Sequence, residues 1–288
     1  MSFVIIIDPL IIRKYLPSIN HLSDGDIKEI FLHTFKESGL PSSQFSLKEN
    51  MIHHCRNHKG TKLEIGPFDS PMLSGEGVHY FDILNQHELK LRAVEHNRNP
   101  NTVPEINYVQ NKGDLSIIDK KFDLVLSSHC IEHTPDFVKH LAQVSNLLNS
   151  GGSYYLIIPD KRYCFDYELP LSTIADLIAA HFDSQTKPPL AKLIEHRALL
   201  SHNNSIRHWL NDHDMAKHHQ EVATQVKSAT DEFSNFDGYI DVHCWRFTPL
   251  SLLEVLKTLK ALNLMPFDSV SISLTPFGRK DFTAVFTR

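Results

Sequence analysis

From residue 62 onward, short apolar runs alternate with longer stretches that carry apolar side chains at helical spacing. This alternation constrains the fold more than any other feature of the sequence, because strands separated by helices form a mostly parallel sheet with helices packed on its faces. We expect strands at residues 62–66, 78–82, 106–110, 122–127 and 153–158. The clearest helix between them covers residues 136–148 and ends before a Gly-Gly pair.

The alternation stops after Pro159. Residues 161–247 are rich in His, Asp, Asn and Pro, and we interpret them as an insertion. Order returns with a helix at 248–262 that begins with Thr-Pro. Two closing strands follow at 267–274 and 281–287, joined by a Pro-Phe-Gly turn.

The predicted fold class is α/β: a Rossmann-like, seven-stranded, mostly parallel sheet with an antiparallel closing strand, an N-terminal helical segment and a large insertion after the fifth strand. The N-terminal segment has one predicted helix, introduced by Ser23 and Asp24. Its apolar residues recur at helical spacing: Ile27, Ile30, Phe31 and Phe35.

Charge and apolar patterning exclude several classes of protein. The formal net charge of -5 provides no basic footprint for nucleic acid. No stretch approaches the roughly 18 uninterrupted apolar residues of a membrane helix, and the apolar start FVIIIDPLII lacks the features of a signal peptide. The four cysteines are scattered without a Cys-x-x-Cys pair. We expect a cytoplasmic protein with no nucleic-acid partner and no integral membrane segment, and its oligomeric state stays open.

Glycine and acidic residues follow the ends of the predicted strands. Gly66 ends LEIG on the first strand and permits a sharp turn with close backbone approach. Asp82 ends the second strand, where a carboxylate can accept both hydroxyl hydrogens of a ribose. Asp114 follows the third strand, where it can accept from an adenine amino group. The fourth strand, FDLVLSS, then runs into HCIEHTPD.

This order of motifs resembles the class I S-adenosylmethionine-dependent methyltransferases, of the methyltransferase type 11-like group, over roughly residues 60–160 and the closing hairpin. More narrowly, IPDKRYCFDYELPLST at 158–173 and DVHCWRFTPLSLLEVL at 241–256 resemble methyltransferases of bacterial surface-polysaccharide biosynthesis. The resemblance implies that S-adenosyl-L-methionine is the cofactor. The residues that it assigns to the cofactor are Glu64, Gly66, Pro67, Phe68, Asp82, Ile83, Asp114, Leu115, Ser128 and His129.

The first motif departs from the family pattern. Phe68 and Ser70 stand where the family has glycines, so we expect a turn that takes positive φ less freely and approaches the cofactor less closely. Pro67 would stiffen this turn, and Asp69 would cap a following helix.

Three residues are candidates for catalysis. His133 follows the fourth strand, where an imidazole can remove the proton of a hydroxyl acceptor, or else Glu132 and His133 only support the loop. Arg162 suits a phosphate or carboxylate on the acceptor, or else it pairs with Asp166. His243 would join Trp245 in a wall of the site, unless Trp245 anchors the core.

The segment 196–220 is dense in histidine. His208 with Asp212, and Asp214 with His218, have the spacing of one helix face, but no His-Glu-x-x-His pattern is present and we predict no metal ligands.

The sequence thus predicts a methyltransferase that acts on a small-molecule or saccharide acceptor, with O-methylation of a saccharide or sugar-linked intermediate as the specific reaction. The alternative is a non-catalytic binding module on a degenerate methyltransferase fold. We divide the chain into an N-terminal helical segment (1–58), a cofactor-binding core (59–160), an acceptor-binding insertion (161–247) and a last helix with the closing hairpin (248–288).

Overall fold

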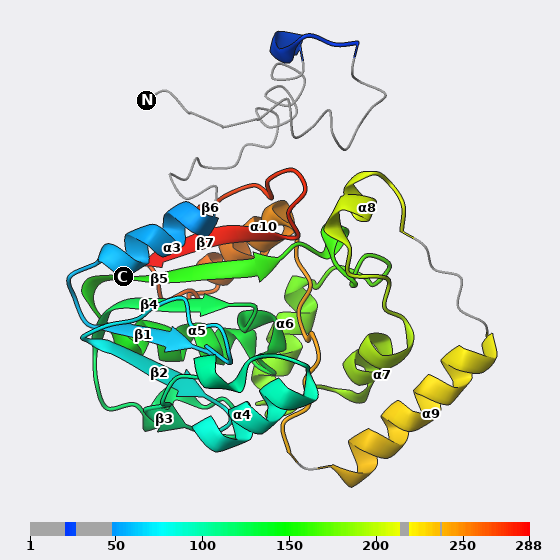
Figure 1. The fold of residues 1–288 in the computed structure, drawn as a ribbon, viewed down its shortest axis with the longest axis horizontal. Coiled ribbons are helices and arrows are strands. Elements are labelled where there is room, and N and C mark those ends of the chain that lie inside the picture. Colours follow the sequence, from blue (N-terminus) through cyan, green and yellow to red (C-terminus); the bar gives the residue numbers. More distant parts are fainter. Residues whose placement is uncertain (1–20, 27–47, 214–218, 237) are drawn as a thin grey trace.

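The computed structural model describes residues 21–26, 48–213, 219–236 and 238–288. The strands in this part of the chain form one seven-stranded sheet, in the order β3-β2-β1-β4-β5-β7-β6 (Figure 1). They are β1 (Lys62–Ile65), β2 (Val78–Asp82), β3 (Tyr108–Val109), β4 (Phe122–Ser128), β5 (Leu148–Pro159), β6 (Ser269–Ile272) and β7 (Asp281–Thr287).

The strands from β1 to β5 pair in parallel, whereas β7 runs antiparallel to both β5 and β6. This confirms the predicted Rossmann-like, seven-stranded, mostly parallel sheet with its antiparallel closing strand. The sheet also has a switch point, because β1 has β2 on one side and β4 on the other. Ligands of wound sheets bind at the carboxyl ends of the strands beside such a point.

The helices agree with the predicted boundaries where caps define them. The α-helices are α3 (Lys48–Asn57), α4 (Gln86–Glu95), α5 (Phe137–Leu147), α6 (Ile174–Phe182), α7 (Leu190–Ala198), α8 (Ser205–Trp209), α9 (His219–Asn235) and α10 (Pro249–Ala261). Short 3-10 helices are η2 (Pro100–Thr102), η3 (Leu115–Ile117), η4 (Ile131–His133) and η5 (Lys161–Tyr163). Asp136 caps α5 by accepting from the Lys139 N–H, and Thr248 caps α10 in a capping box with Ser251.

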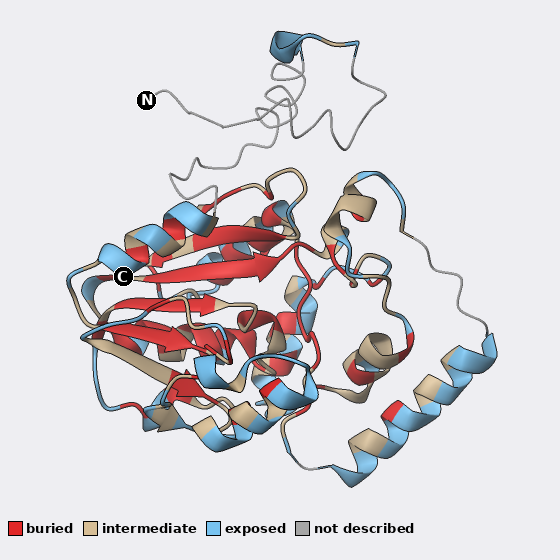
Figure 2. Ribbon diagram, viewed as in Figure 1, coloured by how far each residue is buried: buried red, intermediate tan, exposed pale blue. Residues whose placement is uncertain are grey.

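Two apolar clusters lie on the two faces of the sheet, since side chains alternate along each strand. On one face Val125 packs with residues of α5 and α10, among them Phe137 and Leu252. On the other face Leu124 packs with Met51 of α3. Figure 2 shows the central strands as buried elements, while the outward side of α3 and most of α9 are exposed.

The helix α3 was not predicted. It precedes β1, and it buries Met51 and Cys55 beside Leu73 on one face of the sheet. No helix occurs between β1 and β2, where residues 66–77 form turns and loops. The sequence pattern was misleading because α3 has a narrow apolar stripe, with only two buried residues among ten.

The predicted helix that Ser23 and Asp24 introduce lies mostly outside the described residues. Within them, residues 24–26 are helical. The Asp26 N–H donates to Ser23 Oγ, and the Ser23 N–H donates to Asp26 Oδ2, which is the reciprocal pattern of a helix start.

The strand β3 is shorter than predicted. Asn107 accepts the Tyr80 N–H with its side-chain Oδ1, at 2.8 Å, in place of a backbone carbonyl. This substitution limits the regular ladder to two residue pairs.

The region predicted as an insertion contains α6, α7, α8, α9 and an extended return segment at residues 238–247. Figure 1 shows α7 and α8 beyond the end of the sheet toward which β4 and β5 point. The return segment docks on η4, because Glu132 O accepts the N–H groups of Cys244 and Trp245. The insertion therefore reaches the carboxyl edge of the sheet.

Candidate active site

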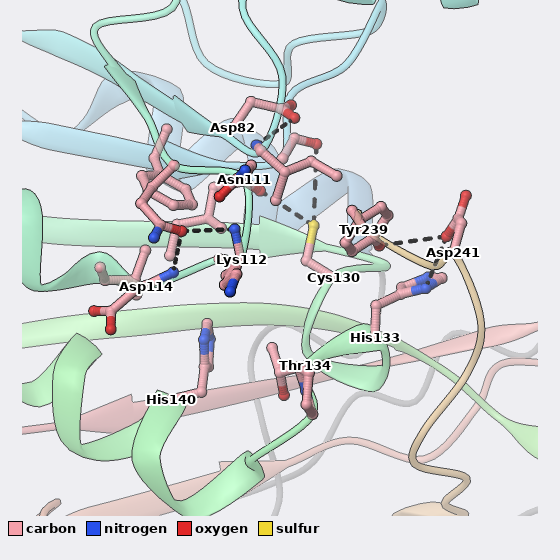
Figure 3. A pocket seen from close by; sticks show the side chains of 18 of the residues that line it. Asp82, Asn111, Lys112, Asp114, Cys130, His133, Thr134, His140, Tyr239 and Asp241 are labelled. Carbon is pink, nitrogen blue, oxygen red and sulfur yellow. Dashed lines mark hydrogen bonds and ion pairs between the residues drawn. The ribbon is translucent and has the colours of Figure 1, made fainter. Parts of the chain in front are cut away.

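A cavity of about 380 Å³ opens where β1, β2 and β4 end (Figure 3). Its lining comes from the ends of these strands, from the loop at 110–115, and from residues 185–188 and 238–241 beyond the core. The volume is in the range of sites that bind small molecules. The cavity thus lies between the wound sheet and the insertion.

Gly66 forms the turn at the end of β1. Its φ is +69°, and a Cβ atom built on it would overlap the Cys130 Sγ atom. Both the backbone conformation and the lack of space therefore require a glycine at this position. The Cys130 thiol lies 3.2 Å from both Ile65 O and Ser128 O, which brings the ends of β1 and β4 together. Burial raises the pKa of this thiol well above its usual value, which disfavours the thiolate that a nucleophilic cysteine needs.

Phe68 lines the cavity and adopts a φ of +46°. The turn therefore takes positive φ where the family has a glycine, which corrects the expectation that the phenylalanine restricts it. The ring packs with Leu89 and Val103, and the Arg98 guanidinium lies 5.4 Å from its centroid. These contacts offset a backbone conformation that costs a non-glycine residue roughly 1–2 kcal/mol.

The predicted helix cap at Asp69 is wrong, because no helix follows within residues 66–77. Asp69 is buried and instead pairs with Arg98, at 2.6 Å between Oδ1 and Nη1. This pair ties the first loop to the segment that follows α4.

Asp82 and Ile83 line the cavity at the end of β2. Asp82 Oδ1 accepts the Ile83 N–H at 2.7 Å. Burial raises the pKa of Asp82 to about 6, although the backbone N–H groups of Leu84, Ile83 and Phe68 favour the charged form. The three backbone N–H groups offset the cost of burial only in part, and the two hydroxyls of a ribose would add further donors to the charged form.

Asp114 and Leu115 line the opposite part of the cavity. Asp114 caps η3 and also accepts from Gln143, at 2.6 Å, and from Lys139, at 3.0 Å. Despite partial burial, the hydrogen bonds from Ser116, Lys139 and Gln143 hold the pKa of Asp114 well below its usual value. The Leu115 N–H has only a long contact of 3.4 Å to Gln143 Oε1, so it is the better placed donor for a base edge.

His133 lines the cavity from the last turn of η4. Its Nδ1 lies 3.0 Å from Asp241 Oδ1 of the return segment, and Asp241 also pairs with Arg92. Burial favours neutral His133, but the contact with Asp241 and the charge of Glu132 together raise its pKa above the ordinary value. The geometry orients the imidazole through a carboxylate, as catalytic histidines are oriented.

His129 lines the same wall, with a φ of +53°. Burial opposes its charge, but the contacts with Asp281 and Glu132 prevail and raise the pKa of His129 to about 9. A positive charge is thus held beside the cavity at neutral pH.

Three predicted cofactor residues are not part of the lining: Glu64, Pro67 and Ser128. The Glu64 carboxylate accepts the N–H groups of Met72 and Leu73, so it holds the loop after β1. Burial raises the pKa of Glu64 to about 7 in spite of these donors. Pro67 is buried in the turn itself, and its carbonyl accepts the Ser70 N–H.

Two predicted catalytic residues also lie outside the lining. The Arg162 guanidinium donates to both oxygens of Asp160, so its predicted pairing with Asp166 is wrong. The guanidinium pairs with Asp160 because this buried carboxylate follows the end of β5, only two residues before Arg162. His243 is buried behind His133, with ring centroids 4.7 Å apart at 88°.

Trp245 is a core anchor. It is 3% exposed, packs edge-on against Phe137 and donates from Nε1 to Thr134 O at 2.6 Å. The interpretation of this residue as a wall of the site is therefore wrong.

Several lining residues were not predicted from the sequence. Those beyond the core are Gln185, Thr186, Lys187, Pro188, Gly238, Tyr239, Ile240 and Asp241. Asp241 begins the segment DVHCWRF, which was singled out for its histidine and tryptophan only. The presence of Asp241 two residues before His243 was the sequence signal that could have indicated a site residue here.

Within the described residues, the histidine-rich segment forms a stack, and the predicted pair of His208 with Asp212 is not formed. His213 stacks on Tyr167, with ring centroids 3.5 Å apart, and His208 Nδ1 lies 3.0 Å from His213 Nδ1. Asp212 pairs with Arg207. The candidates Asp214 and His218 lie outside the described residues.

Comparison with protein families identifies residues 73–156 as a match to a methyltransferase domain. This confirms the predicted methyltransferase domain, with S-adenosylmethionine as its cofactor. A comparison with curated proteins gave no match.

The chain is also similar to solved methyltransferase structures. A SAM-dependent methyltransferase from Thermotoga maritima is 11% identical, with 83% of this chain and 86% of that chain covered and a TM-score of 0.40. An O-methyltransferase family protein from Burkholderia thailandensis is 10% identical over 84% and 56%, with a TM-score of 0.37. For the CcbJ methyltransferase from Streptomyces caelestis the identity is 16%, the coverage 39% and 51%, and the TM-score 0.29. This chain thus spans about half the length of the last two proteins.

The residues at the carboxyl edge fit the cofactor. Asp82 is a buried carboxylate at the end of β2, Gly66 leaves room for close approach, and the Leu115 N–H makes only a long contact of 3.4 Å that a base could replace. Among the helices of the described residues, none has the length and apolar character needed to cross a membrane.

Proposed function

We propose that the protein transfers a methyl group from S-adenosylmethionine to a hydroxyl group of a small acceptor, specifically a saccharide or a sugar-linked intermediate of surface-polysaccharide synthesis. The observation that carries this proposal is that one cavity joins Asp82, at the cofactor end, to His133, at the insertion end. The cytoplasm is the compartment in which such intermediates and the cofactor would meet.

In the cofactor part of the cavity, Asp82 would accept the ribose hydroxyls. The Leu115 N–H would donate to the adenine ring, and Asp114 would lie near its amino group. Gly66, Phe68, Ile83 and His129 would form the remaining walls. When bound, the cofactor supplies an electrophilic methyl group on a sulfonium, which transfers in line to the acceptor oxygen.

In the acceptor part, His133 would take the proton of the hydroxyl, oriented by Asp241 in the manner of an orienting carboxylate. The lining beyond the core is rich in polar groups, with Gln185, Thr186, Lys187 and Asp241. Hydroxyl-rich molecules offer partners to such side chains, which supports a saccharide. We therefore assign the acceptor to the insertion (161–247) and the cofactor to the core (59–160).

The first experiment is calorimetric titration of the full chain with S-adenosylhomocysteine. We expect binding by the unaltered protein and a loss of at least tenfold in affinity for Asp82→Asn, whereas Asp119→Asn, which alters an exposed carboxylate, is the matched control. Absence of binding by the unaltered protein at millimolar ligand would favour a non-catalytic module.

The second experiment addresses the acceptor. Release of S-adenosylhomocysteine is measured with a panel of nucleotide-activated sugars, with small phenols and amines as comparison acceptors. Turnover confined to the phenols or amines would reject the saccharide while leaving methyl transfer intact.

A further inference from the structure

Three imidazoles converge on the carboxylate of Glu132, at the wall of the cavity. Glu132 Oε1 lies 3.5 Å from His129 Nδ1, 3.8 Å from His133 Nε2 and 3.9 Å from His243 Nε2. Glu132 is only 1% exposed, and both carboxylate oxygens lack a hydrogen-bond partner among the described residues. A buried carboxylate in this state costs several kcal/mol unless a cation lies beside it.

The far nitrogen of each imidazole already faces an aspartate. His243 Nδ1 lies 2.6 Å from Asp166 Oδ2, and His133 Nδ1 lies 3.0 Å from Asp241 Oδ1. In a neutral histidine the proton on Nδ1 would be donated to the aspartate, which leaves an unprotonated lone pair on Nε2. In that tautomer the Nε2 atoms of His133 and His243, which lie 3.8 Å and 3.9 Å from Glu132 Oε1, are available as metal ligands.

The aspartates do not need the histidines to be charged. Asp166 also pairs with Arg246, Asp241 with Arg92, and Asp281, which faces His129, with Lys48. Glu132 has no such arginine or lysine partner among the described residues. Among the described residues, Glu132 therefore depends on the surrounding imidazoles for countercharge.

We propose that Glu132, His133 and His243 bind one divalent transition-metal ion, of the class of Zn²⁺. One ligand atom from each of the three residues lies within 4.8 Å of the other two. Ligand atoms about a tetrahedral zinc are separated by roughly 3.4 Å, so each histidine needs to approach Glu132 by about half an ångström and the two histidines need to approach each other by at most about 1.4 Å. Asp166 forms with His243 Nδ1 the kind of outer hydrogen bond that metal-binding imidazoles require, and Asp241 Oδ1 lies 3.0 Å from His133 Nδ1 as an ion-pair contact.

This site differs from the histidine stack in the insertion. There His208 Nδ1 lies against His213 Nδ1 and His208 Nε2 lies against the carbonyl of His202, so both nitrogens of the central ring are used. Among the described residues, that stack contains no buried carboxylate. His213 is consequently a suitable control position.

The role of the metal rests on the proposed function. His133 lines the cavity, so the ion would lie next to the acceptor end, where a hydroxyl bound to it would lose its proton to water more readily. His133 would then act as a metal ligand, and its use as a free base is the competing outcome.

The test uses the full chain, stripped with a chelator and dialysed. We expect one equivalent of Zn²⁺ by elemental analysis after the ion is added back, and a visible absorption band on titration with Co²⁺. His243→Gln and Glu132→Gln should each weaken Co²⁺ binding at least tenfold, Asp241→Asn should weaken it about 10- to 100-fold, and His213→Gln should leave it unchanged.

Thermal unfolding and S-adenosylhomocysteine binding are measured on every variant, so that misfolding is recognised and a failure of cofactor binding is recorded separately. The proposal is overturned if the stripped protein takes up no metal, or if His213→Gln loses the metal and His243→Gln retains it. Metal binding without any effect of a chelator on turnover would retain the site and overturn its role in the reaction, because His133 can serve as a base only when no metal is bound to it.

Discussion

The close contact between Gly66 and Cys130 makes a quantitative prediction. Gly66→Ala introduces two costs: a Cβ at a φ of +69°, worth roughly 1–2 kcal/mol, and an overlap with Cys130 Sγ, of the kind that costs about 1–3 kcal/mol in packed interiors. We expect a loss of about 2–5 kcal/mol in the free energy of unfolding from both together.

The two costs can be separated. Gly151 has a φ of +76° and no atom within 4 Å of an added Cβ, so Gly151→Ala measures the backbone cost alone. Cys130→Ala removes the Sγ atom, and the Cβ that remains at position 130 lies at an ordinary 3.8 Å from the Cβ added at Gly66. The double variant Gly66→Ala/Cys130→Ala should therefore recover the overlap cost.

The assay is denaturant unfolding with a shared slope, which gives the coupling energy from a double-mutant cycle. We expect a favourable coupling of about 1–3 kcal/mol. Additivity of the two single changes within about 0.5 kcal/mol would refute the reasoning, because it would mean that the thiol does not occupy the space above Gly66.

Buried charges and ion pairs give three further predictions. Affinity for S-adenosylhomocysteine should fall as the pH drops through about 6, because the ribose hydroxyls favour ionised Asp82 and the pKa of this carboxyl is about 6 without them. Calorimetry at pH 5 and pH 8 tests this prediction. An equal pH dependence of the affinity in Asp82→Asn would contradict it. Burial lowers the pKa of His140 from 6.5 to about 4, so as the pH falls the unfolded state takes up the proton before the folded state does. The free energy of unfolding should therefore decline by about 3 kcal/mol between pH 6.5 and pH 4. His140→Gln should reduce that decline, and an equal decline in both proteins would exclude His140 as its source. Glu232→Gln breaks the bidentate ion pair that joins α9 to Arg197 of α7, so amide hydrogen exchange in α9 should accelerate. The free energy of global unfolding should change by less than about 1 kcal/mol, because both side chains are partly exposed. Unchanged exchange would mean that this ion pair does not hold α9 in place.

The parts of the fold that were predicted correctly depend on local signals. β2 was predicted as residues 78–82 and is observed as Val78–Asp82. The start of α10 follows from Thr248 and Pro249, whose capping chemistry is complete within a few residues. Such elements are specified by their own sequence, independently of what packs on them.

The parts that were missed depend on contacts between distant residues. α3 is held to the sheet by Met51 and Cys55, a pattern too short to distinguish from a surface segment. At the site, Asp82, Asp114 and His133 were predicted because they follow strands, whose carboxyl ends meet at one edge. The approach of Asp241 to His133 spans 108 positions of the sequence (241 minus 133), and no local rule encodes it.

The antiparallel direction of β7 has a consequence for how the site is completed. Parallel strands bring their last residues to the carboxyl edge, whereas β7 brings its first: Asp281 pairs in register with Pro159 at the end of β5 and faces His129. A residue from the final strand thereby supports a wall built by the centre of the chain, and Lys48, ahead of β1, contacts the same carboxylate. The segment 73–156 that carries the family match therefore does not contain all the residues that support the wall around His129.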